Sequence, residues 1–169
     1  MPPKTLLNSI YLLSQPKVGL VHHLPTGTDP QTLGSGLEYA FLNTSHAKMY
    51  SSINALDIDS CVVGKSTLFR KADLDKHCGG LRSFGNTMSE DNAIGQALRK
   101  AGLKHVMGPE LAQQSLGRMP VKAYFDRRGR WIRIRVHTVM LPTLLEMFSE
   151  SVMSGITGSW AVESLFGVA

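Results

Sequence analysis

Two groups of side chains, about forty residues apart, have the types and spacing that catalysis on a charged substrate needs. The first is Glu90-Asp91, which follows Ser89 at the start of a predicted helix. A carboxylate at a helix start near a sheet edge can act as general base toward a substrate hydroxyl. An acid in the first turn also stabilises the helix itself, because the helix dipole favours negative charge there. Asp91 is therefore a candidate catalytic base, with helix capping as the alternative.

The second group is the run Arg127-Arg128-Gly129-Arg130-Trp131. Guanidinium groups bind phosphate oxygens through paired hydrogen bonds, and an indole offers a flat wall to a sugar or a lipid. Residues 122–135 hold six of the 18 basic residues and one of the 13 acidic residues, which leaves the rest of the chain formally neutral. Such a cluster suits a pyrophosphate, nucleic-acid phosphates or an anionic membrane surface. A solvated basic helix face is the alternative, and nucleic acid is not expected because no recognition module accompanies the run.

Three shorter motifs have plainer readings. The sequence Asp57-Ile58-Asp59 resembles the DxD with which many sugar-nucleotide transferases hold a metal, but two solvated acids at the edge of a strand would look the same. His22 and His23 follow an apolar run, where His22 in particular could reach a site or could be structural. Gly64-Lys65-Ser66 resembles the end of a P-loop, but Asp59 stands where that motif requires its first glycine.

Apolar spacing of three and four residues predicts helices, and short β-branched runs predict strands. In chain order we expect a helix over 6–13, a strand over 18–24, a helix over 33–44, a strand over 58–64, a helix over 89–100 and a strand over 104–108. Turn-forming residues 25–30 separate the first strand from the next helix. Strands that alternate with helices indicate an α/β fold with a mostly parallel sheet.

Composition bounds the class of protein. A chain of 169 residues with 43% hydrophobic residues can form one domain with an ordinary apolar core. Cys61 and Cys78 have no zinc-ligand spacing and suit a reducing, intracellular compartment. We do not expect a signal peptide, because Asn8 and Ser9 interrupt the first apolar run.

Residues 136–169 are rich in apolar side chains, but acids divide them. The longest stretch without charge covers residues 151–162, and a membrane span needs about 20 residues. Glu146 and Glu150 stand four apart and so share one helical face, opposite apolar residues that include Leu144, Phe148 and Val152. An amphipathic helix at a membrane surface is predicted, with a helix packed on the domain's own core as the alternative.

Several stretches, taken in order, resemble the ceramide glucosyltransferases, a family of membrane-bound inverting transferases with a Rossmann-like GT-A domain. They are KVGLVHHLP, FLNTSHAKMY, CVVGKSTLFRKADLDKHCGGL, SEDN, RRGRW and MLPTLLEMFSES. The resemblance implies that residues 1–135 are the acceptor-side part of a GT-A domain. It also implies that residues 136–169 form a membrane-associated helical segment.

The family pattern is three aspartates followed by (Q/R)xxRW. Asp91 matches the third aspartate, the catalytic base, and His22 matches a family histidine near the substrate. Arg127, Arg130 and Trp131 match the last motif, which closes the substrate site, with Arg in place of Gln at its first position. The resemblance implies that Asp91 deprotonates the primary hydroxyl of ceramide, which attacks UDP-glucose with inversion to give β-glucosylceramide.

The same resemblance sets expectations about cofactor, partners and place in the cell. A divalent metal, Mg²⁺ or Mn²⁺, would be held by the first two aspartates, which lie upstream of this chain, and no residue of the chain is assigned to it. UDP-glucose, ceramide and membrane lipids are the implied partners, at a Golgi or ER membrane with the catalytic part facing the cytosol. The chain by itself is expected to be incomplete and inactive. A processive polysaccharide synthase of the same superfamily and a non-catalytic membrane-surface fragment are the alternatives.

Overall fold

The computed structural model describes residues 3–57, 62–138 and 140–167, except for the side chains of residues 3, 138 and 140–150. Contacts divide the chain into two compact units, residues 1–124 and residues 125–169. The boundary between domains expected at residue 135 stays a prediction.

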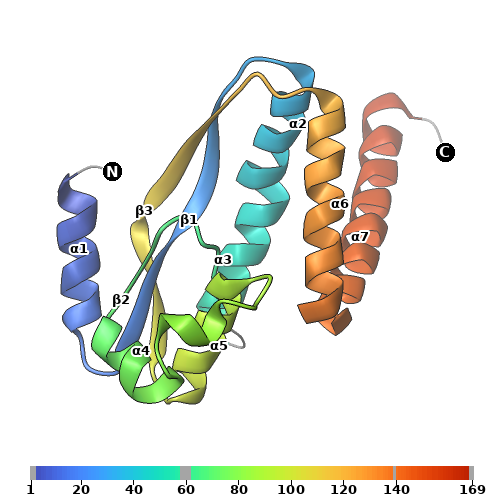
Figure 1. Ribbon diagram of the computed structural model, residues 1–169. Helices are drawn as coiled ribbons and strands as arrows, with labels where there is room; N and C mark the ends of the chain where they lie inside the picture. The colour runs from blue at the N-terminus through green and yellow to red at the C-terminus, as the bar shows by residue number, and fades with distance from the viewer. Residues whose placement is uncertain (1–2, 58–61, 139, 168–169) are drawn as a thin grey trace. The chain divides into compact units, whose positions relative to one another are not determined.

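The first unit is built on a sheet of three strands in the order β2-β1-β3 (Figure 1). The strands are β1 (Val18–Pro30), β2 (Thr67–Phe69) and β3 (Lys104–Gly117). The central strand β1 pairs antiparallel with β2 and parallel with β3. The α/β class is confirmed, whereas the expected predominance of parallel pairs is not, because the described sheet contains one pair of each kind.

Strand β1 is longer than the sequence predicts. The prediction of turns over residues 25–30 is wrong, because Leu24–Pro30 pairs with Leu111–Gly117 of β3. Pro25 and Pro30 lack a backbone N–H but fit this strand. Strand β2 pairs only with residues 20–22 of β1, so beyond His22 no described strand on that edge requires a hydrogen-bond donor from β1. Pro109 falls at an irregularity in the register, where an amide donor is also not required.

The strand predicted over residues 58–64 falls partly on residues 58–61, which lie outside the described residues. For Val62–Gly64 the prediction is wrong, since these residues form a loop and the strand comes later, at β2. Val62 is nevertheless buried, with only 5% of its surface exposed. The side chain of Val62 is therefore buried although the residue lies in a loop and not in a strand.

The predicted helices are confirmed, with further helices between them. In chain order they are α1 (Pro3–Ser14), α2 (Leu33–Phe41), the π-helical turn η1 (Leu42–His46), α3 (Ala47–Leu56), α4 (Lys71–Cys78), the 3₁₀ turn η2 (Leu81–Phe84) and α5 (Glu90–Lys100). Reciprocal hydrogen bonds between Thr32 and Ser35 cap α2. Asp57 ends α3 in the left-handed conformation, with φ of 50°. In Figure 1, α1 lies on one side of the sheet and α2 and α3 lie on the other.

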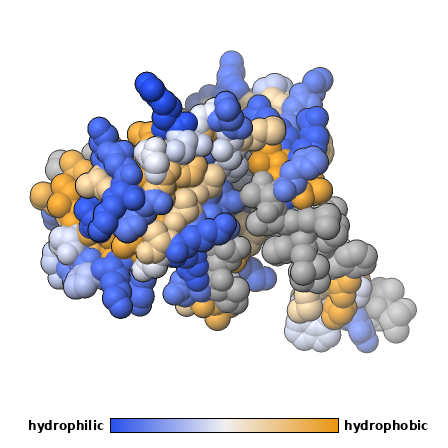
Figure 2. Space-filling model, turned by 60° about the horizontal axis from the view of Figure 1, so that its bottom comes forward, coloured by the Kyte–Doolittle hydropathy of each residue, from blue (hydrophilic) through white to orange (hydrophobic). Residues whose placement is uncertain are grey.

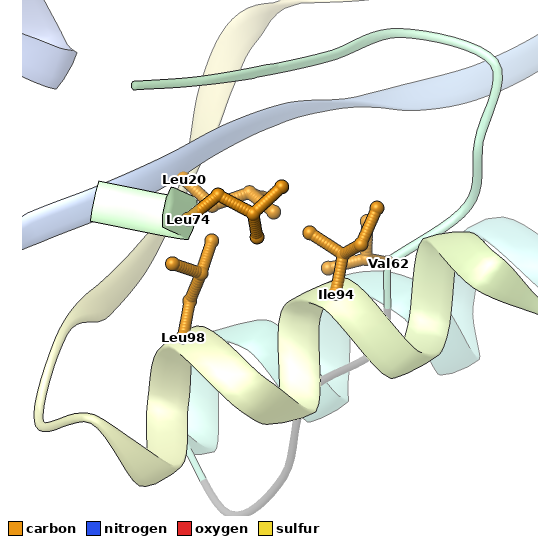
Figure 3. Packing of buried hydrophobic residues seen from close by; sticks show 5 residues of the cluster. All are labelled: Leu20, Val62, Leu74, Ile94 and Leu98. Atoms are coloured by element: carbon orange, nitrogen blue, oxygen red, sulfur yellow. The ribbon is translucent and has the colours of Figure 1, made fainter. Parts of the chain in front are cut away.

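Two apolar clusters hold these helices to the sheet. The larger one joins β1, α4 and α5 to the loop before β2, through Leu20, Val62, Leu74, Ile94 and Leu98 (Figure 3). The smaller one joins α1 to β1 through Leu13, Val18 and Val21. Since successive side chains of a strand point to opposite faces, Leu20 and Val21 bring different helices onto the two faces of β1.

The second unit contains most of α6 (Val121–Thr138) and all of α7 (Met140–Phe166). Among the helices that the structure describes, none is long and apolar enough to cross a membrane. Large apolar side chains are nevertheless exposed along the later part of α7, at Val152, Met153, Ile156, Trp160, Val162, Leu165 and Phe166. Figure 2 shows hydrophobic and hydrophilic side chains interspersed over one face of the molecule.

Candidate active site

Asp91 lies in the first turn of α5, and three donors hold its carboxylate. The backbone N–H of Gly64 donates to Oδ2 over 2.7 Å. The Ser89 hydroxyl and the Asn92 backbone N–H donate to Oδ1 over 2.9 and 2.8 Å. The orientation of the carboxylate is therefore set from two parts of the chain, the start of α5 and the loop before β2.

This arrangement leaves Asp91 able to take a proton. The two oxygens of a carboxylate offer about four lone-pair positions, of which the three donors use three. Oδ2 keeps a position for a substrate hydroxyl, and the residue is only half-buried. Ser89 stands at the N-cap position of α5 but makes no capping hydrogen bond to the helix backbone, because its hydroxyl donates to Asp91 instead. An oriented, accessible carboxylate is what a general base requires.

His22 points from β1 toward α3, and its side chain is fully buried. Nδ1 is hydrogen-bonded to the hydroxyl of Tyr50, and the two rings meet edge to face with centroids 5.3 Å apart. Burial, and then the neighbouring His105 and His23, lower the pKa of His22 to about 4, although a hydrogen bond with Asn54 acts in the opposite direction. His22 is therefore neutral at pH 7, and its predicted contact with a substrate stays a prediction.

The residues Arg127–Trp131 lie together on α6, in the unit 125–169. The guanidinium carbons of Arg128 and Arg127 lie 4.4 and 5.6 Å from the centroid of the Trp131 ring. These cation–π contacts follow from the helical spacing of three and four residues. Arg130 is exposed. The run thus forms a cationic group around one indole, while Asp91 and His22 lie in the other unit.

Comparison with known proteins identifies the family. The family model described as glycosyl transferase family 21 matches residues 1–169. The chain belongs to this family. The ceramide glucosyltransferase of Komagataella phaffii is 37% identical over 89% of this chain and 36% of its own length. Ceramide glucosyltransferase 1 of Caenorhabditis elegans is 32% identical over 92% of this chain and 33% of its own length.

A third relative, the ceramide glucosyltransferase of Candida albicans, is 34% identical over 79% of this chain and 31% of its own length. The resemblance inferred from sequence motifs is thereby confirmed. The chain spans about a third of the length of these curated relatives. No solved structure matches it significantly.

The DxD-like motif has only its first residue among those described. Asp57 is 64% exposed, and its Oδ1 accepts a hydrogen bond from Nη1 of Arg99 over 2.5 Å. The hydrogen bond and the charge of Arg99 lower the pKa of Asp57. Ile58 and Asp59 lie outside the described residues. Within the described part of this family 21 chain, no three His, Cys, Asp or Glu side chains are grouped so as to hold a metal ion, and no step is assigned to a metal bound there.

Sequence reasoning missed the contacts that hold Asp91. The sequence places Ser89 at the start of a helix and Gly64 in a P-loop-like motif, and neither pattern indicates a contact with the carboxylate of Asp91. The structure gives Gly64 a different role, since its N–H is a donor to Asp91. The available signal was the glycine itself: a Cβ at Gly64 would lie 3.2 Å from Cβ and Oδ2 of Asp91, so a side chain there would crowd the carboxylate.

Proposed function

We propose that this chain is the acceptor-side part of a ceramide glucosyltransferase that transfers glucose from UDP-glucose to the primary hydroxyl of ceramide. The observation that carries the proposal is the carboxylate of Asp91, which is oriented by three donors and keeps a lone-pair position on Oδ2. Three relatives of the chain carry the name ceramide glucosyltransferase. These names favour ceramide over a growing polysaccharide as acceptor.

In this mechanism Asp91 accepts the proton of the acceptor hydroxyl as the oxygen attacks the anomeric carbon. The new C–O bond forms on the face opposite the leaving UDP, so configuration inverts and the product is β-glucosylceramide. A divalent cation bound upstream would compensate charge on the pyrophosphate. Arg127 and Arg130 would add cationic stabilisation of the leaving UDP, and Trp131 would wall the site, with Arg128 stacked on the indole.

The test is Asp91→Asn in the longest natural protein that contains residues 1–169. We expect glucosylceramide formation from UDP-glucose and ceramide to fall by about 10²–10⁴-fold, because the amide cannot take up the proton. Asp75→Asn is the matched control, since Asp75 is an exposed acid on α4. Undiminished synthesis by the Asp91 variant would remove the proposed base. A polymer formed without ceramide would instead indicate a synthase.

We also propose that the enzyme works at a Golgi or ER membrane on its cytosolic side. Attachment to a membrane is supported by the exposed apolar residues of α7, which include Ile156 and Trp160 at 60% and 68% exposure. Their spacing of four places them on one helical face, as an interfacial helix requires. Replacing both by Ser should reduce co-flotation with ceramide-containing vesicles, whereas Ser154→Ala, on the same helix, should not. If the double Ser variant floated with the vesicles as well as the unmodified protein, the membrane role of α7 would be contradicted.

A further inference from the structure

The loop of residues 62–66, called the strap below, connects Asp91 to strand β1. Its central residue, Gly64, donates its N–H to Oδ2 of Asp91 over 2.7 Å. A tight turn surrounds this donor, since the N–H of Lys65 donates to the Val63 carbonyl over 2.7 Å. A Cβ at Gly64 would lie 3.2 Å from Oδ2, so a side chain there would crowd the carboxylate. The position of the strap therefore determines how Asp91 is held.

The two ends of the strap are anchored by different means. At one end, Val62 is buried in the apolar cluster with Ile94 and Leu98 of α5. At the other end, Ser66 is bound to β1 through two hydrogen bonds with His23. The His23 backbone N–H donates to the Ser66 carbonyl over 3.2 Å, and the Ser66 Oγ lies 2.8 Å from His23 Nδ1. Hydrogen bonds depend on direction and apolar contacts do not, so the Ser66 anchor is the one that constrains the orientation of the strap.

His23 is itself held rigidly, with only 2% of its surface exposed. On its far side, Nε2 lies 3.2 Å from the Ser9 Oγ of α1 and 3.8 Å from Oε2 of Glu110 on β3. A Cβ at Gly108 would come within 2.6 Å of Nε2, so β3 closes against the ring. Helix α1, strand β3 and the strap therefore limit rotation of the imidazole.

The hydrogen bonds of Ser9 also indicate which nitrogen of His23 carries the hydrogen when the ring has one. Ser9 Oγ donates its single hydrogen to the Thr5 carbonyl over 2.6 Å. Ser9 must therefore accept from His23, which places the ring hydrogen on Nε2. Nδ1 is then an acceptor and takes the hydrogen of the Ser66 hydroxyl. The side chains of Ser9, His23 and Ser66 form one directed chain of hydrogen bonds.

We propose that His23 is a positioning residue for the transfer reaction: through Ser66 it fixes the strap, and the strap orients Asp91. The inference rests on the proposed role of Asp91 as the base. His23 is separate from the predicted substrate residue His22, because adjacent strand residues point to opposite faces of the sheet. It acts on the rate of the chemical step and not on binding of UDP-glucose.

The test separates the two sides of the His23 ring. His23→Asn places an amide oxygen near the position of Nδ1 and keeps an acceptor for Ser66. His23→Gln places its amide near Nε2 and keeps the contact with Ser9 while losing Ser66. In the longest natural protein that contains residues 1–169, His23→Gln and Ser66→Ala should lower kcat about tenfold with the KM for UDP-glucose within about twofold. His23→Asn should stay within about threefold of the original kcat.

Further measurements make the outcome decisive. The double variant His23→Gln/Ser66→Ala should be no slower than either single variant, because both remove the same contact. His77→Asn, at an exposed histidine of α4, is the control. Ser66→Ala removes one hydroxyl and keeps the inference testable if a His23 variant does not fold.

Two results would overturn the inference. In the first, His23→Gln is active and His23→Asn is slow, which would mean that His23 serves only to hold α1. In the second, all strap variants keep the original kcat while Asp91→Asn is inactive, which would leave the proposed function intact. If Asp91→Asn is fully active, the proposed function fails by itself.

Discussion

Two neighbouring histidines of strand β1 lie on opposite faces of the sheet and have different contacts. His22 points toward α3, where its fully buried ring meets Tyr50. His23 points toward α1, where it meets the hydroxyls of Ser9 and Ser66. Both side chains are buried and hydrogen-bonded, but His22 also packs against the Tyr50 ring, whereas His23 lies between two serine hydroxyls. The surroundings, and not the residue type, therefore decide that His23 belongs to a chain of serine hydrogen bonds, whereas His22 contacts an aromatic ring.

The apolar clusters on the two faces differ in size, and this gives the largest expected effect. Leu98 is fully buried in the larger cluster, on the face of His22, whereas Leu13 is 8% exposed in the smaller cluster under α1. Truncation of buried leucines costs about 2–5 kcal/mol of unfolding free energy. We expect Leu98→Ala in the upper half of this range and Leu13→Ala in the lower half, measured by urea denaturation. A larger loss of unfolding free energy for Leu13→Ala than for Leu98→Ala would show that the smaller cluster contributes more to stability.

Lowering the pH should reduce the stability of the fold through His22. Unfolded His22 binds a proton as pH falls through 6.5, but the folded protein does so only near pH 4. The unfolded state then holds more protons, so stability is complete above pH 6.5 and falls by about 3 kcal/mol toward pH 4.

Urea midpoints measured across this pH range check the effect. His22→Asn, which keeps a polar group beside the Tyr50 hydroxyl, should flatten the decrease, and the exposed His77→Asn should leave it unchanged. An equal slope in the protein and in the His22 variant would contradict the assignment.

Helix α2 lies on the same face of the sheet as His22 (Figure 1). Replacing its glycines Gly34 and Gly36 by alanine should change the stability of the protein in opposite directions. A Cβ at Gly34 would lie 2.4 Å from the Met119 carbonyl oxygen, so Gly34→Ala should cost about 1–3 kcal/mol. At Gly36 the added Cβ would meet no heavy atom within 4 Å beyond the adjacent backbone of its own helix. Gly36→Ala should therefore stabilise the helix by about 0.5–1 kcal/mol. Thermal melting of the two variants measures both, and a stabilised Gly34→Ala would show that α2 is not in close contact there.

The smallest effect is expected at the exposed end of α5. Asp57 pairs with Arg99 there, while Asp91 contacts Gly64 at the other end of the same helix. Asp57→Asn keeps an oxygen that can accept from Arg99, so it should change neither glucosylceramide synthesis nor the melting temperature measurably. A large loss of activity would restore the metal-binding reading of the DxD-like motif.

Part of the fold could be predicted from local patterns alone. The apolar spacing in α1, α2 and α5 identified these helices, because a helix needs one buried stripe whatever it packs against. Strand extents were harder. Leu24–Pro30 contains turn-forming residues, but pairing with β3 supplies hydrogen bonds that outweigh local preference. The direction of β2 was also beyond local reasoning, since it depends on the path of the loop that precedes it.

For the site, the sequence by itself determined which side chains have the right chemistry: the acid Asp91 and the cationic and aromatic group from Arg127 to Trp131. Their types, order and spacing carry that information, and they also identify the family. Only the tertiary structure decided how Asp91 is oriented. Its partner Gly64 lies 27 residues earlier, and the anchor of the strap, His23, lies 43 residues before Ser66. Residues so far apart in the sequence form hydrogen bonds only after the helix has packed against the strand. Local sequence patterns do not show which distant residues come into contact.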